Sequence, residues 1–128
     1  MKSCFGSLIL LLSATMAQAG ISPNDPLPKR ILTCRGSVIT SIGSRLEGDT
    51  DFSSGTSIFY KNGGAQVSYD KIPAIVDSKK GDHVFICLVF VPEKCPKGDT
   101  RGKIYTTTNL RTLDSWTLPD SQHSCGGA

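Results

Sequence analysis

The sequence lacks most of the residue patterns that support catalysis or hold a cofactor. Its 128 residues contain two histidines, His83 and His123, and no Gly-x-Ser-x-Gly nucleophile elbow, P-loop or Gly-x-Gly-x-x-Gly fingerprint. No cysteines are spaced as Cys-x-x-Cys and no His-x-x-x-His occurs, so the usual spacings of zinc ligands are missing. We therefore expect neither a cofactor nor a bound metal ion.

A strong excess of one charge is also missing. The formal net charge is +3 and falls to +2 without Lys2, which is too weak to indicate a nucleic-acid partner. Residues 79–111 nevertheless hold seven basic and three acidic side chains, a net charge of +4. This basic segment predicts either a solvated surface or a contact with an acidic partner.

Long hydrophobic runs are absent, because no apolar stretch approaches the roughly 20 residues of a membrane-spanning helix. The N-terminus instead has Lys2, a short apolar run at Leu8–Leu12 and the small-residue site Ala17-Gln18-Ala19, which together are typical of a signal peptide cleaved after residue 19. Cys4 lies before the run, so no lipid anchor is expected. The mature chain is predicted to be periplasmic or secreted, without a membrane anchor, and its oligomeric state stays open.

The cysteine count fits this compartment. Cleavage would remove Cys4 and leave an even number of cysteines, which predicts two disulfides in an oxidising environment. Four cysteines can pair in three ways. Of these we favour Cys87–Cys95, which closes a short loop, together with Cys34–Cys125, which ties the start of the domain to its tail.

The chain divides into three parts: the signal peptide at 1–19, a leader at 20–30 that holds three prolines, and a single β domain at 31–128. Residues 43–55 are rich in Gly, Ser and Asp and predict a long loop. Asn62-Gly63 supplies the positive φ of a tight hairpin turn.

Short runs of apolar, β-branched and aromatic residues predict strands, and no window combines a helical period with caps. Residues 83–91 are apolar on both alternating faces, which predicts a central strand covered on both sides. The fold class is therefore all-β, a small antiparallel barrel or sandwich. The expected strands are residues 31–42 with a break near Gly36, 56–61, 65–69, 83–91, 103–108 and 115–118.

One set of motifs is shared with a known family. Ser54-Gly55 precedes Tyr60, Lys80-Gly81-Asp82 follows, and Cys34 in the first strand is matched by Cys125 near the end. In this arrangement the chain resembles the periplasmic C-type lysozyme inhibitors of Gram-negative bacteria, which are small exported β-barrels. Tyr60 lies further from the Ser-Gly pair than in that family.

The resemblance implies a binding site formed by Ser54, Gly55, Tyr60 and Lys80. In the family, the residues that match Ser54 and Lys80 enter the active-site cleft of an enzyme. Two cysteines of this chain, Cys87 and Cys95, have no counterpart in the family pattern.

The favoured hypothesis is an exported, non-enzymatic binding protein, an inhibitor or immunity protein whose partner is a cell-wall hydrolase or toxin. A compact, disulfide-linked domain loses little entropy when one of its loops fills a cleft, and the basic segment would complement an acidic groove. Two alternatives stay open. One is a small secreted hydrolase in which Asp120 orients His123 and a nearby serine attacks; the other is an envelope or adhesion module without an enzyme partner.

Overall fold

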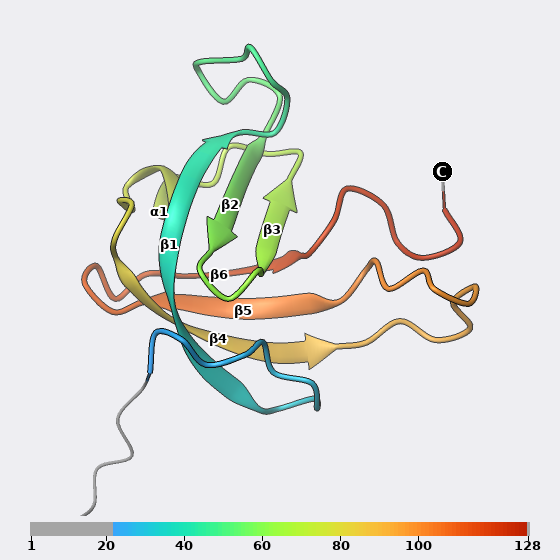
Figure 1. The fold of residues 1–128 in the computed structure, drawn as a ribbon. Helices are drawn as coiled ribbons and strands as arrows, with labels where there is room; N and C mark the ends of the chain where they lie inside the picture. The colour runs from blue at the N-terminus through green and yellow to red at the C-terminus, as the bar shows by residue number, and fades with distance from the viewer. Residues whose placement is uncertain (1–21, 128) are drawn as a thin grey trace, which may run out of the picture.

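The computed structural model describes residues 22–127, so the predicted signal peptide at 1–19 lies outside the described residues. Within the described part, one antiparallel sheet has the strand order β3-β2-β1-β4-β5-β6 and curls into a half-barrel (Figure 1). The predicted all-β fold with two disulfides is confirmed. The elements are β1 (Cys34–Ser44), β2 (Thr56–Tyr60), β3 (Ala65–Ser68), α1 (Pro73–Val76), β4 (His83–Phe90), β5 (Ile104–Asn109) and β6 (Ser115–Pro119).

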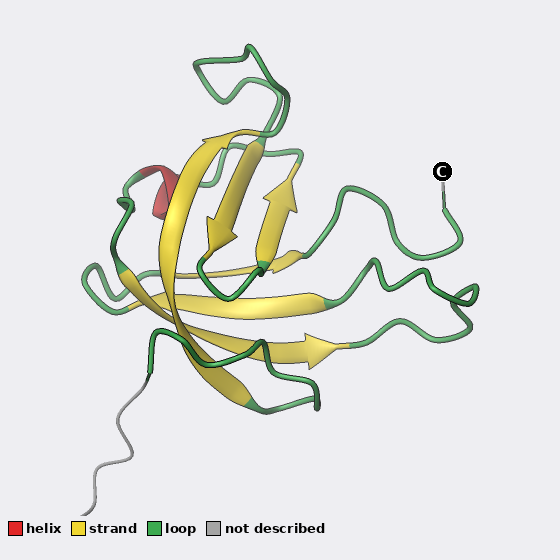
Figure 2. Cartoon of the chain, in the orientation of Figure 1, coloured by secondary structure: helices red, strands yellow, loops and turns green. Residues whose placement is uncertain are grey.

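Strand β1 belongs to both halves of the sheet. Its first part, from Cys34 to Val38, pairs with β4, and its second part, from Ile39 to Ser44, pairs with β2. The register shifts between Ile39 and Ser41, where the strand changes partner. Figure 2 shows the result: β2 and β3 run at a steep angle to β4, β5 and β6, so the sheet folds onto itself.

The break predicted near Gly36 is wrong. Gly36 is buried and pairs with Phe85 in the middle of the β1–β4 ladder. The backbone hydrogen bonds of that ladder, with Ser37 and Val38 continuing the strand, outweigh the low strand preference of one glycine. The bend occurs instead at the partner change, beyond Ile39.

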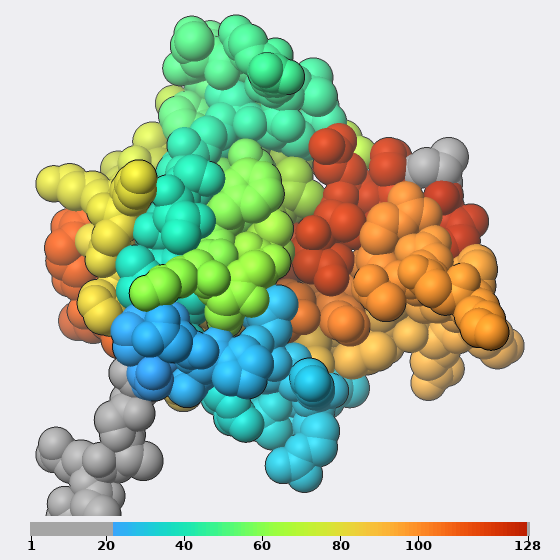
Figure 3. Space-filling view, viewed as in Figure 1, coloured from blue at the N-terminus to red at the C-terminus, as the bar shows by residue number. Residues whose placement is uncertain are grey.

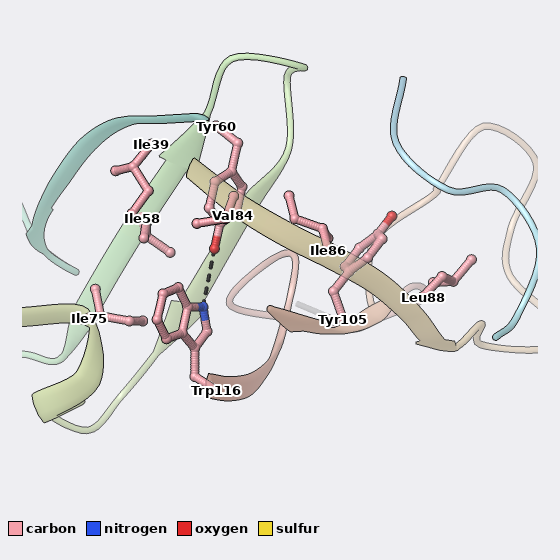
Figure 4. Close-up of a cluster of buried hydrophobic side chains, with 9 residues drawn as sticks. All are labelled: Ile39, Ile58, Tyr60, Ile75, Val84, Ile86, Leu88, Tyr105 and Trp116. Atoms are coloured by element: carbon pink, nitrogen blue, oxygen red, sulfur yellow. Dashed lines mark hydrogen bonds between the residues drawn. The ribbon is translucent and has the colours of Figure 1, made fainter. Parts of the chain in front are cut away.

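The core lies between the two halves of the folded sheet, where Figure 4 shows side chains from opposing strands meeting. Strand β4 pairs with β1 and β5, as a central strand should. Only its inward residues are fully buried, however, while Phe85, Cys87 and Val89 are half-buried on the outer face. The prediction of full cover on both sides is therefore wrong. The buried apolar residues are Ile39, Ile58, Tyr60, Ile75, Val84, Ile86, Leu88, Tyr105 and Trp116.

The side chain of Gln66 closes the half-barrel from inside. It projects from β3, is 1% exposed, and its amide nitrogen donates to the backbone carbonyls of Tyr105 on β5 (2.7 Å) and Leu118 on β6 (3.1 Å). These two residues pair with each other in the β5–β6 ladder. The amide of one side chain thus joins strands at opposite ends of the sheet order.

The Gln66 amide oxygen is also fully used. It accepts from the hydroxyls of Tyr60 and Thr107, both at 2.7 Å, and from the indole N–H of Trp116 at 3.0 Å. The same indole lies 3.1 Å from the Tyr60 hydroxyl, the contact drawn in Figure 4. Burial raises the pKa of Tyr60, which therefore stays a neutral donor.

The predicted disulfide pairing is wrong, although two disulfides are present. Cys34 lies directly opposite Cys87 in the β1–β4 ladder, with 4.0 Å between their Cα atoms, and these two are bonded. Cys95 bonds Cys125, which ties the β4–β5 loop to the C-terminal tail. Closeness in sequence favoured Cys87–Cys95, but strand register decides which side chains meet across a sheet.

The helix α1 was not predicted. It contains four residues, starts at Pro73 in the position that proline favours, and buries Ile75 completely. One turn of helix is too short to show a hydrophobic period, so the pattern could not reveal it.

Replacing Gln66 by leucine should lower the free energy of unfolding by about 3–5 kcal/mol, because it leaves buried hydroxyl, indole and carbonyl groups without partners. Denaturant unfolding measures this loss. The control is Thr106→Val, whose hydroxyl pairs with that of Thr117 on the outer face and should change stability by about 0.5 kcal/mol or less. Equal effects of the two substitutions would contradict the closing role of Gln66.

Candidate functional site

The loop between β1 and β2, residues 45–55, projects from one end of the half-barrel. Figures 1 and 3 show it as a knob above the body of the domain. Its outer part carries the acidic residues Glu47, Asp49 and Asp51, in contrast to the weakly basic chain as a whole. Leu46 is 48% exposed beside them. The loop therefore offers a negatively charged tip with one exposed apolar side chain.

The carboxylate of Asp49 holds the loop in one conformation. It accepts hydrogen bonds from the backbone amide of Ser54 at 2.8 Å and from the Ser54 hydroxyl at 2.5 Å. Its other oxygen accepts from the amide of Asp51 at 3.1 Å and from the hydroxyl of Ser53 at 3.3 Å. The Ser54 hydroxyl in turn accepts from the amide of Leu46 at 3.1 Å. We call this set of contacts the Asp49 clasp.

The Asp49 clasp holds the pKa of that carboxyl well below its usual range. The hydrogen bond from the Ser54 hydroxyl is the largest cause, and the backbone amide of Ser54 comes next. Hydrogen bonds to a carboxylate favour its charged form. The clasp is therefore complete at neutral pH.

Arg45 braces the base of the loop against the rest of the domain. Its Nε donates to the carbonyl of Ser54 at 2.6 Å, and one Nη donates to the side-chain oxygen of Gln122 at 2.8 Å. The guanidinium lies 4.3 Å from the centre of the Tyr69 ring, within the range of a cation–π contact. The Tyr69 hydroxyl donates to the carbonyl of Gln122 at 3.3 Å. The C-terminal tail thus supports the loop.

Gly55, predicted as a binding residue, has a structural role in the fold. Its φ of +116° lies in a region that favours glycine. A Cβ at this position would lie 2.1 Å from the carbonyl oxygen of Ser68 and 2.8 Å from the backbone of Tyr69. The 45–55 loop can end beside β3 only because residue 55 has no side chain.

The other predicted binding residues do not share a surface. Ser54 is half-buried, with its hydroxyl inside the Asp49 clasp, and Tyr60 is 4% exposed in the core. Lys80 is exposed in the α1–β4 loop, where the neighbouring amide of Gly81 donates to the carbonyl of Ile39. The stretch of β1 from Ile39 to its end separates Lys80 from the loop, about 16 Å of strand at ~3.3 Å per residue.

The Lys80-Gly81-Asp82 motif also holds the fold together. The carboxylate of Asp82 accepts hydrogen bonds from Nε and Nη2 of Arg111, at 2.7 and 2.9 Å, and from the side-chain amide of Asn109 at 2.9 Å. These contacts hold the pKa of Asp82 well below its usual range, with the Arg111 hydrogen bonds as the main cause. They fasten the α1–β4 loop to the β5–β6 turn.

The basic segment 79–111 does not form one patch. Lys79 and Lys80 precede β4, while Lys94 and Lys97 follow it, so the length of that strand lies between the two pairs. Arg101 and Arg111 form ion pairs with Asp99 and Asp82. A single basic surface is therefore not assembled from this segment.

In the C-terminal cluster proposed for a hydrolase, Ser121 is not placed for a relay through His123. The hydroxyl of Ser121 donates to the backbone carbonyl of His123 at 2.7 Å and lies 3.2 Å from Oδ1 of Asp120. That same carboxylate oxygen accepts from the amide of Gly102 at 2.8 Å. The serine thus faces the carboxylate directly, whereas a relay needs the imidazole between them.

Comparisons with protein families, curated proteins and solved structures gave no match. Within residues 22–127, no cluster of three His, Cys, Asp or Glu side chains is placed to hold a metal ion. In the same part of the chain, no helix is long and apolar enough to cross a membrane. The 45–55 loop is thus the candidate site on its geometry alone.

Gly55→Ala should destabilise the protein by at least about 3 kcal/mol, because it adds a backbone clash to the strain of a positive φ. Gly48→Ala is the matched control: its φ is +84°, but nothing lies within 4 Å of an added Cβ. That substitution should cost about 1 kcal/mol. Thermal unfolding of both variants distinguishes them, and a milder effect at Gly55 than at Gly48 would refute the close approach.

The Asp49 clasp should also show a characteristic pH dependence. Because the folded-state pKa is depressed below the ordinary value of about 3.9, the clasp contributes stability above about pH 4 and loses it as the pH falls further. Amide hydrogen exchange at Ser54 measures this. In the unaltered protein we expect the Ser54 amide to remain protected at pH 4. In Asp49→Asn we expect this protection to be lost even at neutral pH. A clasp that opens near pH 4 or above in the unaltered protein would contradict the lowered pKa of Asp49.

Proposed function

We propose that the protein is a non-enzymatic binding protein of the inhibitor or immunity type, whose 45–55 loop enters the substrate cleft of a cell-wall hydrolase. The observation that carries this proposal is the Asp49 clasp on a loop that projects from the domain. A loop that is already ordered loses little conformational entropy on binding, so more of the contact energy contributes to affinity.

The charge of the loop sets the chemistry of the cleft that it would fill. Glu47 and Asp51 are exposed at its tip, and Asp49 is ionised. A cleft lined by arginine or lysine would complement this charge and speed the encounter. This reverses the expectation drawn from the basic segment, because the residues that project are acidic.

Lys80 takes no part in this version of the site. It lies along β1 from the loop, near Ile39, whereas the family resemblance would place it in the same cleft as Ser54. Ser54 instead acts through the Asp49 clasp, which keeps the loop in its projecting shape. The proposal therefore predicts different effects for changes at these two positions.

The test measures peptidoglycan hydrolysis by purified muramidases, amidases and endopeptidases in the presence of the protein. We expect at least one of these enzymes to be inhibited. Glu47→Lys, which reverses a tip charge without touching the clasp, should weaken inhibition by about tenfold or more. Glu93→Lys makes the same charge change in the β4–β5 loop and should leave inhibition unaltered, as should Lys80→Ala.

Several outcomes would overturn the proposal. They are failure to inhibit any of the three classes, equal effects of Glu47→Lys and Glu93→Lys, and full inhibition by a Ser54→Ala variant whose loop amides have lost protection from exchange. Release of soluble wall fragments by the protein alone, abolished in His123→Ala, would establish the hydrolase alternative instead.

A further inference from the structure

A second exposed surface lies at the start of β1, at the end of the strand opposite the 45–55 loop. Here Leu32 has a backbone conformation that favours glycine. The amide of Leu32 donates to the carbonyl of Leu88 at 2.8 Å, and the amide of Leu88 donates to the carbonyl of Thr33 at 3.0 Å. Two residues thus face one across the ladder, and Leu32 has a φ of +63°. This is the arrangement of a G1 bulge, whose first residue is normally glycine because of its left-handed backbone.

Packing does not explain the choice of leucine. The Leu32 residue is 81% exposed, so its backbone strain is not offset by burial of its side chain. Ile31, next to it, is 52% exposed. Phe90 lies two residues beyond Leu88 at the end of β4 and is 47% exposed. Three large apolar side chains therefore reach solvent around this bulge, and we call them the bulge patch.

The charges around the bulge patch are almost all positive. Lys29, Arg30 and Arg35 flank it in sequence, with no acidic residue between positions 29 and 35, and Lys94 follows Phe90 in the β4–β5 loop. Within residues 22–127, the ion pairs are Arg101–Asp99 and Arg111–Asp82, so these four cations have no ionic partner in the fold. Glu93 is the one acidic neighbour in sequence on the β4 side.

We propose that the bulge patch binds the surface of an anionic lipid bilayer. Exposed apolar side chains would enter the boundary between headgroups and acyl chains, while the lysines and arginines contact lipid phosphates. A protein partner fits less well, because a stable protein interface covers about 800 Å² on each side, whereas this patch is two side chains on a projecting turn and a third at the end of β4. The blue-to-cyan segment at the lower end of Figure 3 shows that it stands out from the domain.

This contact does not depend on the proposed function. The bulge at Ile31 and Leu32 precedes the first residue of β1, and the 45–55 loop follows its last, so the strand holds the two at opposite ends of the domain (Figure 1). A domain resting on a membrane by the bulge patch would leave the 45–55 loop pointing away from the lipid.

The experiment uses the full chain, expressed with its own N-terminus and purified without reductant. Binding is measured by co-sedimentation with vesicles of phosphatidylglycerol and phosphatidylcholine in equal parts, and with vesicles of phosphatidylcholine alone. We expect binding to the anionic vesicles that weakens as salt is added, and weaker binding to the neutral ones. Leu32→Gly should reduce the affinity about tenfold, the effect of removing one partly inserted leucine.

The matched control is Leu113→Gly. Leu113 also has a left-handed backbone, with φ of +63°, and is 77% exposed, but it lies in the β5–β6 turn, away from the bulge patch. Both substitutions place glycine where the backbone favours it, so both variants should unfold at the same denaturant concentration as the unaltered protein or at a higher one. Only Leu32→Gly should lose lipid binding.

Three results would overturn the proposal: no binding to anionic vesicles at low salt, unchanged binding by Leu32→Gly, or equal losses in the two glycine variants. Saturable binding to polyglutamate without any binding to vesicles would assign the bulge patch to an acidic polypeptide instead. None of these results alters the hydrolase assay, so failure here and failure of the proposed function are distinguishable.

Discussion

The amide of Gln66 is the contact on which the closed shape of this domain depends. A six-stranded sheet of this kind has two free edges, and β3 and β6 approach each other without forming a ladder. In place of that ladder, the amide nitrogen of Gln66 donates to carbonyls on β5 and β6, and its amide oxygen accepts hydrogen bonds from three buried donors. Buried polar groups stabilise a fold only when all of them are satisfied, and the described residues leave no buried side-chain polar atom without a partner.

Strand β1 connects two projecting elements at opposite ends of this closed domain. Because it exchanges one partner strand for the other near Ile39, it runs the length of the domain and carries a projecting element before its first residue and after its last. Both elements depend on unusual backbone: Gly55 is required where the 45–55 loop meets β3, and Leu32 is held in a left-handed conformation at the bulge. One restricted backbone position thus lies at each of the two proposed contacts.

The sequence predicts where the strands of this domain lie better than it predicts which strands lie side by side. Alternation in β2 and β5 and the Asn62-Gly63 turn are local signals, so the hairpins are predictable, and the alternation of Thr56, Ile58 and Tyr60 could have shown that Tyr60 points inward. The double partnership of β1 is not predictable, because alternation says nothing about which strand lies alongside. The same limit explains the disulfides, since Cys34 and Cys87 meet through register. Ser54 was predicted as a site residue, but its bond to Asp49 depends on how the loop folds.

The partner change in β1 also has a kinetic consequence. The β2–β3 hairpin and the β4–β5–β6 strands each form from segments close in sequence. The β1–β4 ladder instead brings together residues far apart in the chain, such as Cys34 and Cys87, which are 53 residues apart. Contacts that distant are slow to form, because the entropy of loop closure is lost before the contacts compensate for it. The Cys34–Cys87 bond lies at the far end of that ladder. Once oxidised, the chain keeps this loop closed even when unfolded, so the slow step need not be repeated each time the domain opens.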